Sequence, residues 1–145
     1  MIEKKNFYIN GKWVSPSKPN DFEVIDPSTE EPFAIISLGS AQDADDAIHA
    51  AKTAFETWRE TTKEERLKLL QKFDEIYNTR WDEMVKAQST EMGAPLDFAS
   101  ETHTKMGADI SKNTIKILKD FNFEHQFDSK SNNHIRYEPI GVCGL

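Results

Sequence analysis

Short apolar runs separated by turn residues occupy the first 38 positions of the chain. Residues 7–9 and 12–14 flank the dipeptide Asn10-Gly11, which favours a tight hairpin because both turn positions require a positive φ. A second pair of apolar runs lies on either side of a loop at residues 26–32, and it covers residues 22–25 and 33–38. The pattern therefore predicts two β-hairpins before residue 39.

From Gly39 onward the apolar positions change to a helical period. Ser40 is a good N-cap residue, and Asp43 follows three positions later, where the helix dipole favours an acid. A second helix is expected to begin at Thr61 or Thr62, since each has a glutamate three positions later and fits a capping box. The apolar stripe of the first helix comprises Ala44, Ala47, Ile48, Ala51, Phe55 and Trp58, and that of the second comprises Leu69, Leu70, Phe73, Ile76 and Tyr77.

Two further helical segments follow. The third carries Trp81 and is expected to stop at Gly93, with Pro95 just beyond as the first residue of the fourth. The fourth is expected to end near Phe121, with Asn113 as a polar interruption of its stripe. The members of that stripe are Leu96, Ala99, His103, Met106, Ile110 and Ile117. The four stripes could pack on one another or on a sheet that this stretch of sequence does not supply.

The last part of the chain, residues 135–145, is apolar and predicts a strand that runs to the final residue. Because natural termini are usually polar and loosely held, we expect the sequence to continue elsewhere. The coarse pattern of β-hairpins, four helical segments and a terminal β-strand is an α/β arrangement.

Composition excludes several classes of protein. The chain has 145 residues, 37% of them apolar, a net charge of -7 and one cysteine. The acidic balance argues against a nucleic-acid partner, and no apolar run is long enough to cross a membrane. A single cysteine makes neither an intrachain disulfide nor a structural zinc site, and no secretory signal opens the sequence. We therefore expect a cytoplasmic protein.

No residue set predicts a catalytic centre. Cys143 lies in an apolar stretch without a neighbouring base, so the favoured interpretation is a small buried side chain. The four histidines, at positions 49, 103, 125 and 134, lack the spacing of a helical metal site and are expected at the surface or the edge of a core. Asp43, Asp45 and Asp46 are better explained by a helix N-terminus than by a cation site. The sequence predicts no catalytic, cofactor-binding or metal-binding residue within the chain.

Taken in order, several short motifs resemble the N-terminal portion of the aldehyde dehydrogenase superfamily. They are residues 8–14, residues 25–32, the helix at 47–58 with its alanine repeat, residues 65–70, the corner at 91–96, and the Glu138-Pro139-x-Gly141-Val142 strand. Each motif is weak alone, whereas their order and spacing cover essentially the whole chain. Ala94 stands where the family usually has a lysine, but the corner itself needs only Gly93 and Pro95.

The resemblance implies a domain organisation and a chemistry. Residues 1–121 would cover the cofactor-binding domain, residues 122–136 would belong to a β projection used in subunit contacts, and residues 137–145 would begin the strand that enters a dinucleotide-binding sheet. The complete enzyme would oxidise an aldehyde to a carboxylic acid with NAD or NADP, through a thiohemiacetal on a catalytic cysteine. The family's catalytic residues fall after residue 145, and Cys143 precedes them, so this chain alone is expected to be inactive and to bind no cofactor.

Three interpretations follow. The chain is the N-terminal part of an NAD(P)-dependent aldehyde dehydrogenase, as a truncated gene product or a shortened form. Alternatively, it is a non-catalytic interaction module that pairs with a full-length dehydrogenase through its terminal strand. The third interpretation is an independent helical domain, in which the four apolar stripes satisfy one another.

Overall fold

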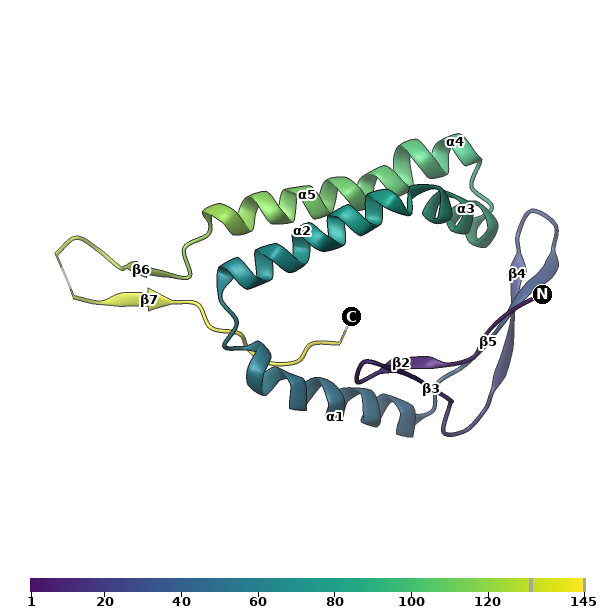
Figure 1. The fold of residues 1–145 in the computed structure, drawn as a ribbon, viewed down its shortest axis with the longest axis horizontal. Coiled ribbons are helices and arrows are strands. Elements are labelled where there is room, and N and C mark those ends of the chain that lie inside the picture. The colour runs from purple at the N-terminus through teal and green to yellow at the C-terminus, as the bar shows by residue number, and fades with distance from the viewer. Residues whose placement is uncertain (131, 145) are drawn as a thin grey trace.

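The computed structural model describes residues 1–130 and 132–144. Three short strands open the chain, and two longer strands pair before the first helix (Figure 1). The strands are β1 Ile2–Lys4, β2 Phe7–Ile9, β3 Lys12–Val14, β4 Asp21–Asp26, β5 Glu31–Ser37, β6 Glu124–Gln126 and β7 His134–Arg136. The helices are α1 Ala41–Trp58, α2 Lys63–Thr79, α3 Trp81–Met92, α4 Leu96–Phe98, the π-helix η1 Ala99–Thr104 and α5 Lys105–Asp120.

Both predicted hairpins are confirmed. Strands β2 and β3 pair antiparallel around Asn10 and Gly11, whose φ angles of 51° and 73° are those the turn requires. Strands β4 and β5 pair antiparallel, with a register shift between Val24 and Ile25. Strand β1 was not predicted, and it joins the other edge of β5 in parallel to give the order β1-β5-β4.

The predicted starts of the first two helices and the end of the third are confirmed by their caps, whereas Pro95, predicted as the first residue of the fourth segment, is instead the N-cap residue of α4. Ser40 and Asp43 form a reciprocal capping box at the start of α1. At α2 the box uses Thr62 and Glu65, which settles the choice between the two threonines. Helix α3 ends at Gly93, whose φ of 68° lies in the left-handed region.

The fourth helical segment differs from the prediction in which face it buries. Its first turns widen into the π-helix η1, which rotates the helix surface relative to a regular α-helix. The buried residues are the small side chains Ala99, Thr104, Ala108 and Ser111. The larger members of the predicted stripe, Leu96, Met106, Ile110 and Ile117, are all exposed. The large members of the stripe therefore do not pack on the other described helices, which leaves the second of the two alternatives for this stripe. The seam with α2 is instead built from small residues that let the two helices approach closely.

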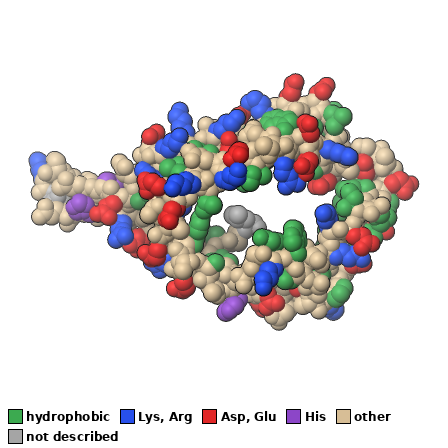
Figure 2. Space-filling model, viewed as in Figure 1, with side chains coloured by type: hydrophobic (Ala, Val, Ile, Leu, Met, Phe, Trp, Pro, Cys, Tyr) green, Lys and Arg blue, Asp and Glu red, His purple; other side chains and the backbone are tan. Residues whose placement is uncertain are grey.

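The elements are arranged around an opening. In Figure 1, α2 and α5 form one side, α1 the opposite side, and the β1–β5–β4 sheet joins them at one end. Helix α3 closes this end by contacting β4. The β6–β7 hairpin projects away from the opposite end. Figure 2 shows the opening in the space-filling view, with hydrophobic side chains along parts of its rim.

Little of the chain is buried. Among the described residues, the buried apolar side chains are those of three alanines, Ala34, Ala99 and Ala108. The accessible surface is 11313 Å², whereas a compact monomer of this mass would expose about 7,600 Å². The surplus of about 3,700 Å² reflects the open arrangement of the whole chain, and large apolar side chains of the helices, such as Phe73 and Ile110, are among the exposed residues.

The predicted terminal strand is not formed within residues 137–144. Strand β7 ends at Arg136, and the Tyr137 N–H then donates to the Phe123 carbonyl at 2.8 Å. Beyond this bond the described segment has no ladder, because a strand requires a neighbouring strand and none lies beside it. Residue 145, the last of the predicted strand, lies outside the described residues.

Candidate functional site

Cys143 is exposed, which corrects the prediction of a buried side chain. The segment from Tyr137 to Gly144 lies without a covering element, so the apolar surroundings expected from sequence do not form. Its thiol sulfur has the Gly141 carbonyl oxygen as its neighbour at 4.0 Å.

The four histidines are dispersed, as expected. His49 is exposed on α1, and His125 and His134 are exposed on the β6–β7 hairpin, where His134 Nδ1 lies 3.8 Å from Glu124. His103 is half-buried, and its ring packs edge-on against Phe98 with 4.8 Å between centroids. Among the residues that the structure describes, no group of three or more His, Cys, Asp or Glu side chains is placed to hold a metal ion.

The carboxyl group of Asp43 has a strongly lowered pKa, and its role is structural. Its carboxylate accepts the backbone N–H groups of Ser17 and Ser40, each at 2.8 Å, and the Ser40 hydroxyl at 2.7 Å. These hydrogen bonds to the charged form lower the pKa of Asp43 to about 2. The carboxylate therefore caps α1 and ties it to the loop after β3, while Asp45 and Asp46 remain exposed.

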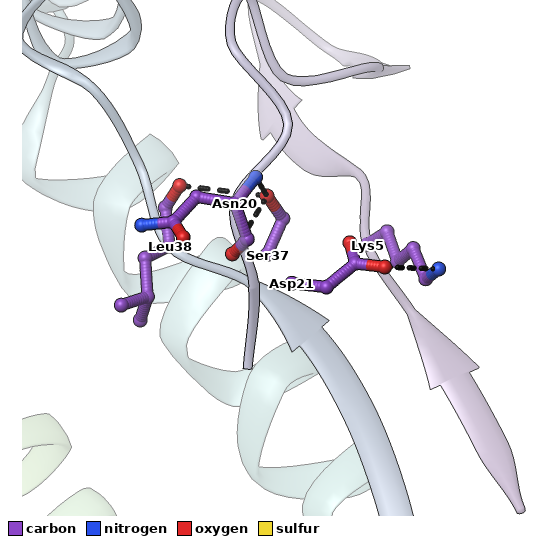
Figure 3. Close-up of polar contacts among 5 residues, drawn as sticks. All are labelled: Lys5, Asn20, Asp21, Ser37 and Leu38. Atoms are coloured by element: carbon purple, nitrogen blue, oxygen red, sulfur yellow. Dashed lines mark hydrogen bonds and ion pairs between the residues drawn. The ribbon is translucent and has the colours of Figure 1, made fainter. Parts of the chain in front are cut away.

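A second polar cluster fastens the end of β5 to the residue that precedes β4 (Figure 3). The buried Ser37 hydroxyl accepts the Asn20 N–H at 3.1 Å, beside the Leu38 carbonyl at 3.4 Å. The Lys5 ammonium pairs with Asp21 at 2.7 Å, and this hydrogen bond raises the pKa of Lys5. The pair joins the chain after β1 to the start of β4 across β5, so this cluster is also part of the scaffold.

The surface of the chain carries several open hollows, and two of them show that none is built around reactive groups. One, of about 710 Å³, is lined by Lys4, Lys5 and Trp13 together with Glu3 and Asn6. The other, of about 440 Å³, lies between residues 59–66 and 136–139 and mixes basic and acidic side chains. Their wide mouths and mixed charges do not define a ligand.

The described residues do not fit a dinucleotide. A pyrophosphate site needs glycines that let the backbone approach the phosphates at the start of a helix. At Gly141 and Gly144 an added Cβ would meet nothing within 4 Å, so no neighbouring group approaches the backbone closely there. No step of nicotinamide chemistry can be assigned to this chain.

The most prominent surface feature is an apolar face on the α2–α5 pair. The two helices are antiparallel, since Lys63 at the start of α2 donates to the Lys119 carbonyl at 3.0 Å, and Tyr77 near its end donates to the Thr104 carbonyl at 3.0 Å. On each helix a stripe of large apolar residues lies outside the seam and is 45% to 65% exposed. The stripes are Leu69, Phe73 and Ile76 on α2 and Met106, Ile110 and Ile117 on α5.

These two stripes lie on one side of the helix pair. Successive residues of an α-helix are rotated by roughly 100° about the helix axis. On both helices the apolar stripe therefore lies a little over a quarter turn, in the same sense, from the residues that face the partner helix. Because the helices run antiparallel, equal rotations point both stripes to the same side. We call these six residues the α2–α5 apolar face.

The opposite side of the pair is charged. Exposed residues there include Lys68 and Glu75 on α2 and Lys112 and Lys116 on α5. Figure 2 shows Lys, Arg, Asp and Glu side chains gathered over this pair. A helical layer that is charged on one side and apolar on the other is typical of a layer that covers a sheet. No helix in the described part of the chain is long and apolar enough to cross a membrane.

Comparison with known proteins identifies the class to which this scaffold belongs. The model of the aldehyde dehydrogenase family matches residues 13–145. The chain therefore belongs to the aldehyde dehydrogenase family, and it corresponds to the N-terminal part of such enzymes, which confirms the resemblance read from its motifs.

Individual relatives show the same fold over a limited share of their length. An aldehyde dehydrogenase from Bartonella henselae has a TM-score of 0.89 and 49% identity over 91% of this chain, but only 28% of its own. Aldehyde dehydrogenase C from Pseudomonas syringae, solved in complex with NAD+ and octanal, has a TM-score of 0.81 and 33% identity, over 83% of this chain and 25% of its own. The 3-succinoylsemialdehyde-pyridine dehydrogenase of a Pseudomonas species is 38% identical over all of this chain and 30% of its own length.

Proposed function

We propose that this chain is the N-terminal scaffold of a cytoplasmic, homo-oligomeric NAD(P)-dependent aldehyde dehydrogenase. Its complete form would oxidise an aldehyde to a carboxylic acid through a thiohemiacetal on a cysteine outside residues 1–145. Within that enzyme the α2–α5 apolar face would cover the cofactor domain, and the β6–β7 hairpin would make subunit contacts. The chain alone is inactive in this proposal, because it supplies neither nucleophile nor base nor cofactor site.

The proposal depends on two observations together: the match to the family and the exposed α2–α5 apolar face. The match extends over residues 13–145. The relatives are more than three times longer, and the chain spans about 30% of the length of the first of them. The complex of the Pseudomonas syringae relative with NAD+ and octanal supports this choice of cofactor and substrate class.

A second candidate function is a non-catalytic module that pairs with a full-length dehydrogenase. It is favoured by the segment 137–144, whose backbone forms no ladder and could add to the edge of another sheet. The third interpretation, an independent helical domain, is opposed by the large exposed apolar area of the helices.

The purified chain, mixed with octanal and either NAD+ or NADP+, tests the proposal. We expect no formation of reduced nicotinamide above the rate without enzyme, while the full-length Bartonella henselae relative in the same assay serves as the positive control. Aldehyde-dependent reduction by the 145-residue chain, retained in a Cys143→Ser variant or abolished by it, would refute the assignment of catalysis to residues outside it.

A further inference from the structure

The turn of the β2–β3 hairpin consists of two residues that can react with each other. Asn10 is followed by glycine, whereas every other asparagine of the sequence is followed by a residue with a side chain. Asn10 is exposed, and a Cβ added at Gly11 would meet nothing within 4 Å. Because glycine has no Cβ, its backbone nitrogen is the least shielded nucleophile that an asparagine carboxamide can have beside it. The turn therefore holds the two groups from which a cyclic imide forms.

The closed turn keeps these two groups apart. The φ angles of Asn10 and Gly11 are 51° and 73°, both in the left-handed region. In that region ψ is about +30° to +60°, which places the nitrogen of the following residue opposite to Cβ. The Gly11 nitrogen therefore reaches the Asn10 Cγ only after ψ of Asn10 has changed, and this change breaks the turn. The reaction requires an open hairpin.

The hairpin is of a kind that opens readily. Its ladder has three residue pairs, from Phe7 with Val14 to Ile9 with Lys12, and β2 and β3 form a two-stranded sheet. The central pair consists of two aromatic rings with 5.2 Å between centroids, and these rings, Tyr8 and Trp13, remain 64% and 69% exposed. A two-stranded hairpin with so little burial is marginally stable in water. The open form is therefore sampled repeatedly.

We propose that the Asn10–Gly11 turn is a self-modification site, at which each opening of the hairpin allows an isoaspartyl linkage to form. The Gly11 nitrogen bonds to the Asn10 Cγ, the bond from Cγ to the carboxamide nitrogen breaks, and ammonia leaves with the proton of the Gly11 N–H. Water then opens the imide at either carbonyl, so position 10 becomes aspartate or isoaspartate. No oxidant or reductant takes part, and the chain becomes one charge more negative than -7.

The two products differ in what they do to the hairpin. Aspartate still fits the left-handed turn. Isoaspartate adds its Cβ to the main chain, and a two-residue loop lengthened by one atom does not keep Ile9 paired with Lys12. The loss reaches α1, because the loop after β3 supplies the Ser17 N–H that the Asp43 carboxylate accepts at 2.8 Å. The isoaspartyl chain should therefore have an open hairpin and a lower urea midpoint.

The test is incubation of the purified chain at neutral pH, followed by peptide mapping and detection of isoaspartate with protein isoaspartyl methyltransferase. Asn10→Gly removes the carboxamide and accepts the positive φ, so it is the control that cannot react. Trp13→Ala removes the ring that packs on Tyr8. Trp58→Ala removes another exposed ring, at the far end of α1 from the hairpin, and is the matched control.

We expect isoaspartate at position 10 of the unaltered chain, less at Asn20 and Asn78, and none at position 10 of Asn10→Gly. Because the rate follows the population of the open form, Trp13→Ala should raise it by roughly 2- to 10-fold, the fold-change that loss of an aromatic pair produces. Trp58→Ala should leave the rate unchanged. In urea, which opens the hairpin in both, the unaltered chain and Trp13→Ala should reach one common, higher rate.

Several results would overturn the inference. One is an absence of isoaspartate at position 10, and another is an equal yield at Asn20 and Asn78. A third is a rate in Trp13→Ala that equals that of the unaltered chain or of Trp58→Ala. The comparison in urea does not depend on the stability of any variant, so a folded chain that reacts as fast as the chain in urea would also contradict the requirement for opening.

Discussion

The contact between Gly107 of α5 and Tyr77 of α2 offers a quantitative test of the helix seam. A Cβ at position 107 would lie 2.5 Å from the Tyr77 hydroxyl oxygen and 3.0 Å from its Cζ. Both distances are too short, so in a Gly107→Ala variant the tyrosine ring must move. The move is resisted because the ring is half-buried and its hydroxyl donates to the Thr104 carbonyl at 3.0 Å.

Opposing free-energy contributions decide whether Gly107→Ala stabilises or destabilises the folded chain. Alanine is favoured over glycine within a helix by about 1 kcal/mol. Against this, overpacking costs about 1–3 kcal/mol and loss of the hydrogen bond about 1 kcal/mol more. We expect Gly107→Ala to lower the free energy of unfolding by about 1–3 kcal/mol, a shift of the urea midpoint of about 1 M measured by far-ultraviolet circular dichroism.

The matched background is Tyr77→Phe, which removes the nearest atom and the hydrogen bond together. In that background Gly107→Ala should be less destabilising by about 1 kcal/mol or more, as a double-mutant cycle would report. If Gly107→Ala raised the urea midpoint in both backgrounds, helix propensity alone would explain it, and the close contact would not constrain the seam.

Three further predictions concern the caps and the acid that fasten the helices. Because the pKa of Asp43 is lowered from 3.8 to about 2 in the folded chain, its contribution to stability is complete above pH 4 and is lost as the pH falls to about 2. Over this interval the urea midpoint of the unaltered chain should approach that of Asp43→Asn, and a constant difference between the two midpoints would contradict the assignment. Thr62→Ala should reduce the free energy of unfolding by about 1 kcal/mol, while Thr62→Ser, which keeps the hydrogen bond to Glu65, should stay within a few tenths in the same titration. Gly93→Ala places a Cβ in the left-handed region and 3.0 Å from Pro27 Cγ, so thermal unfolding should show a loss of about 1–2 kcal/mol, and an unchanged melting temperature would argue against this contact.

Local features of the fold could be predicted because their partners are a few residues apart. The capping boxes at Ser40 and Thr62 each use an acid three positions later. The turn at Asn10 and the helix end at Gly93 need only a positive φ at one or two residues. The motifs that identify the family are of the same short-range kind, and their order carried the assignment.

Long-range features could not be predicted. Strand β1 is short and polar, and it is a strand because it pairs in parallel with β5, more than thirty residues away in sequence. The seam of α5 was missed because Ala108 and Ser111 contribute little to an apolar pattern, whereas the exposed Met106 and Ile110 dominate it. The exposure of Cys143 depends on which protein lies beside it, which no local pattern encodes.

For the candidate site too, local patterns supported predictions whereas tertiary packing did not follow from them. The sequence predicts no catalytic, cofactor-binding or metal-binding residue within the chain, and this stays a prediction. It also left open whether the four apolar stripes pack on one another or on another layer. For the stripes of α2 and α5, exposure and rotation away from the seam favour another layer, and this rotation depends on tertiary packing.

The contact of α3 with β4 has a consequence for the order of folding. Gly93 meets Pro27 there, and the contact closes a loop of more than sixty residues. The α2–α5 pair and the β4–β5 hairpin each form over shorter separations, and they reach this contact from opposite ends of the chain. Closure of the loop should therefore be the slow event in folding, and in native-state hydrogen exchange the two halves should open as separate units, with the amides around Gly93 among the first to lose protection.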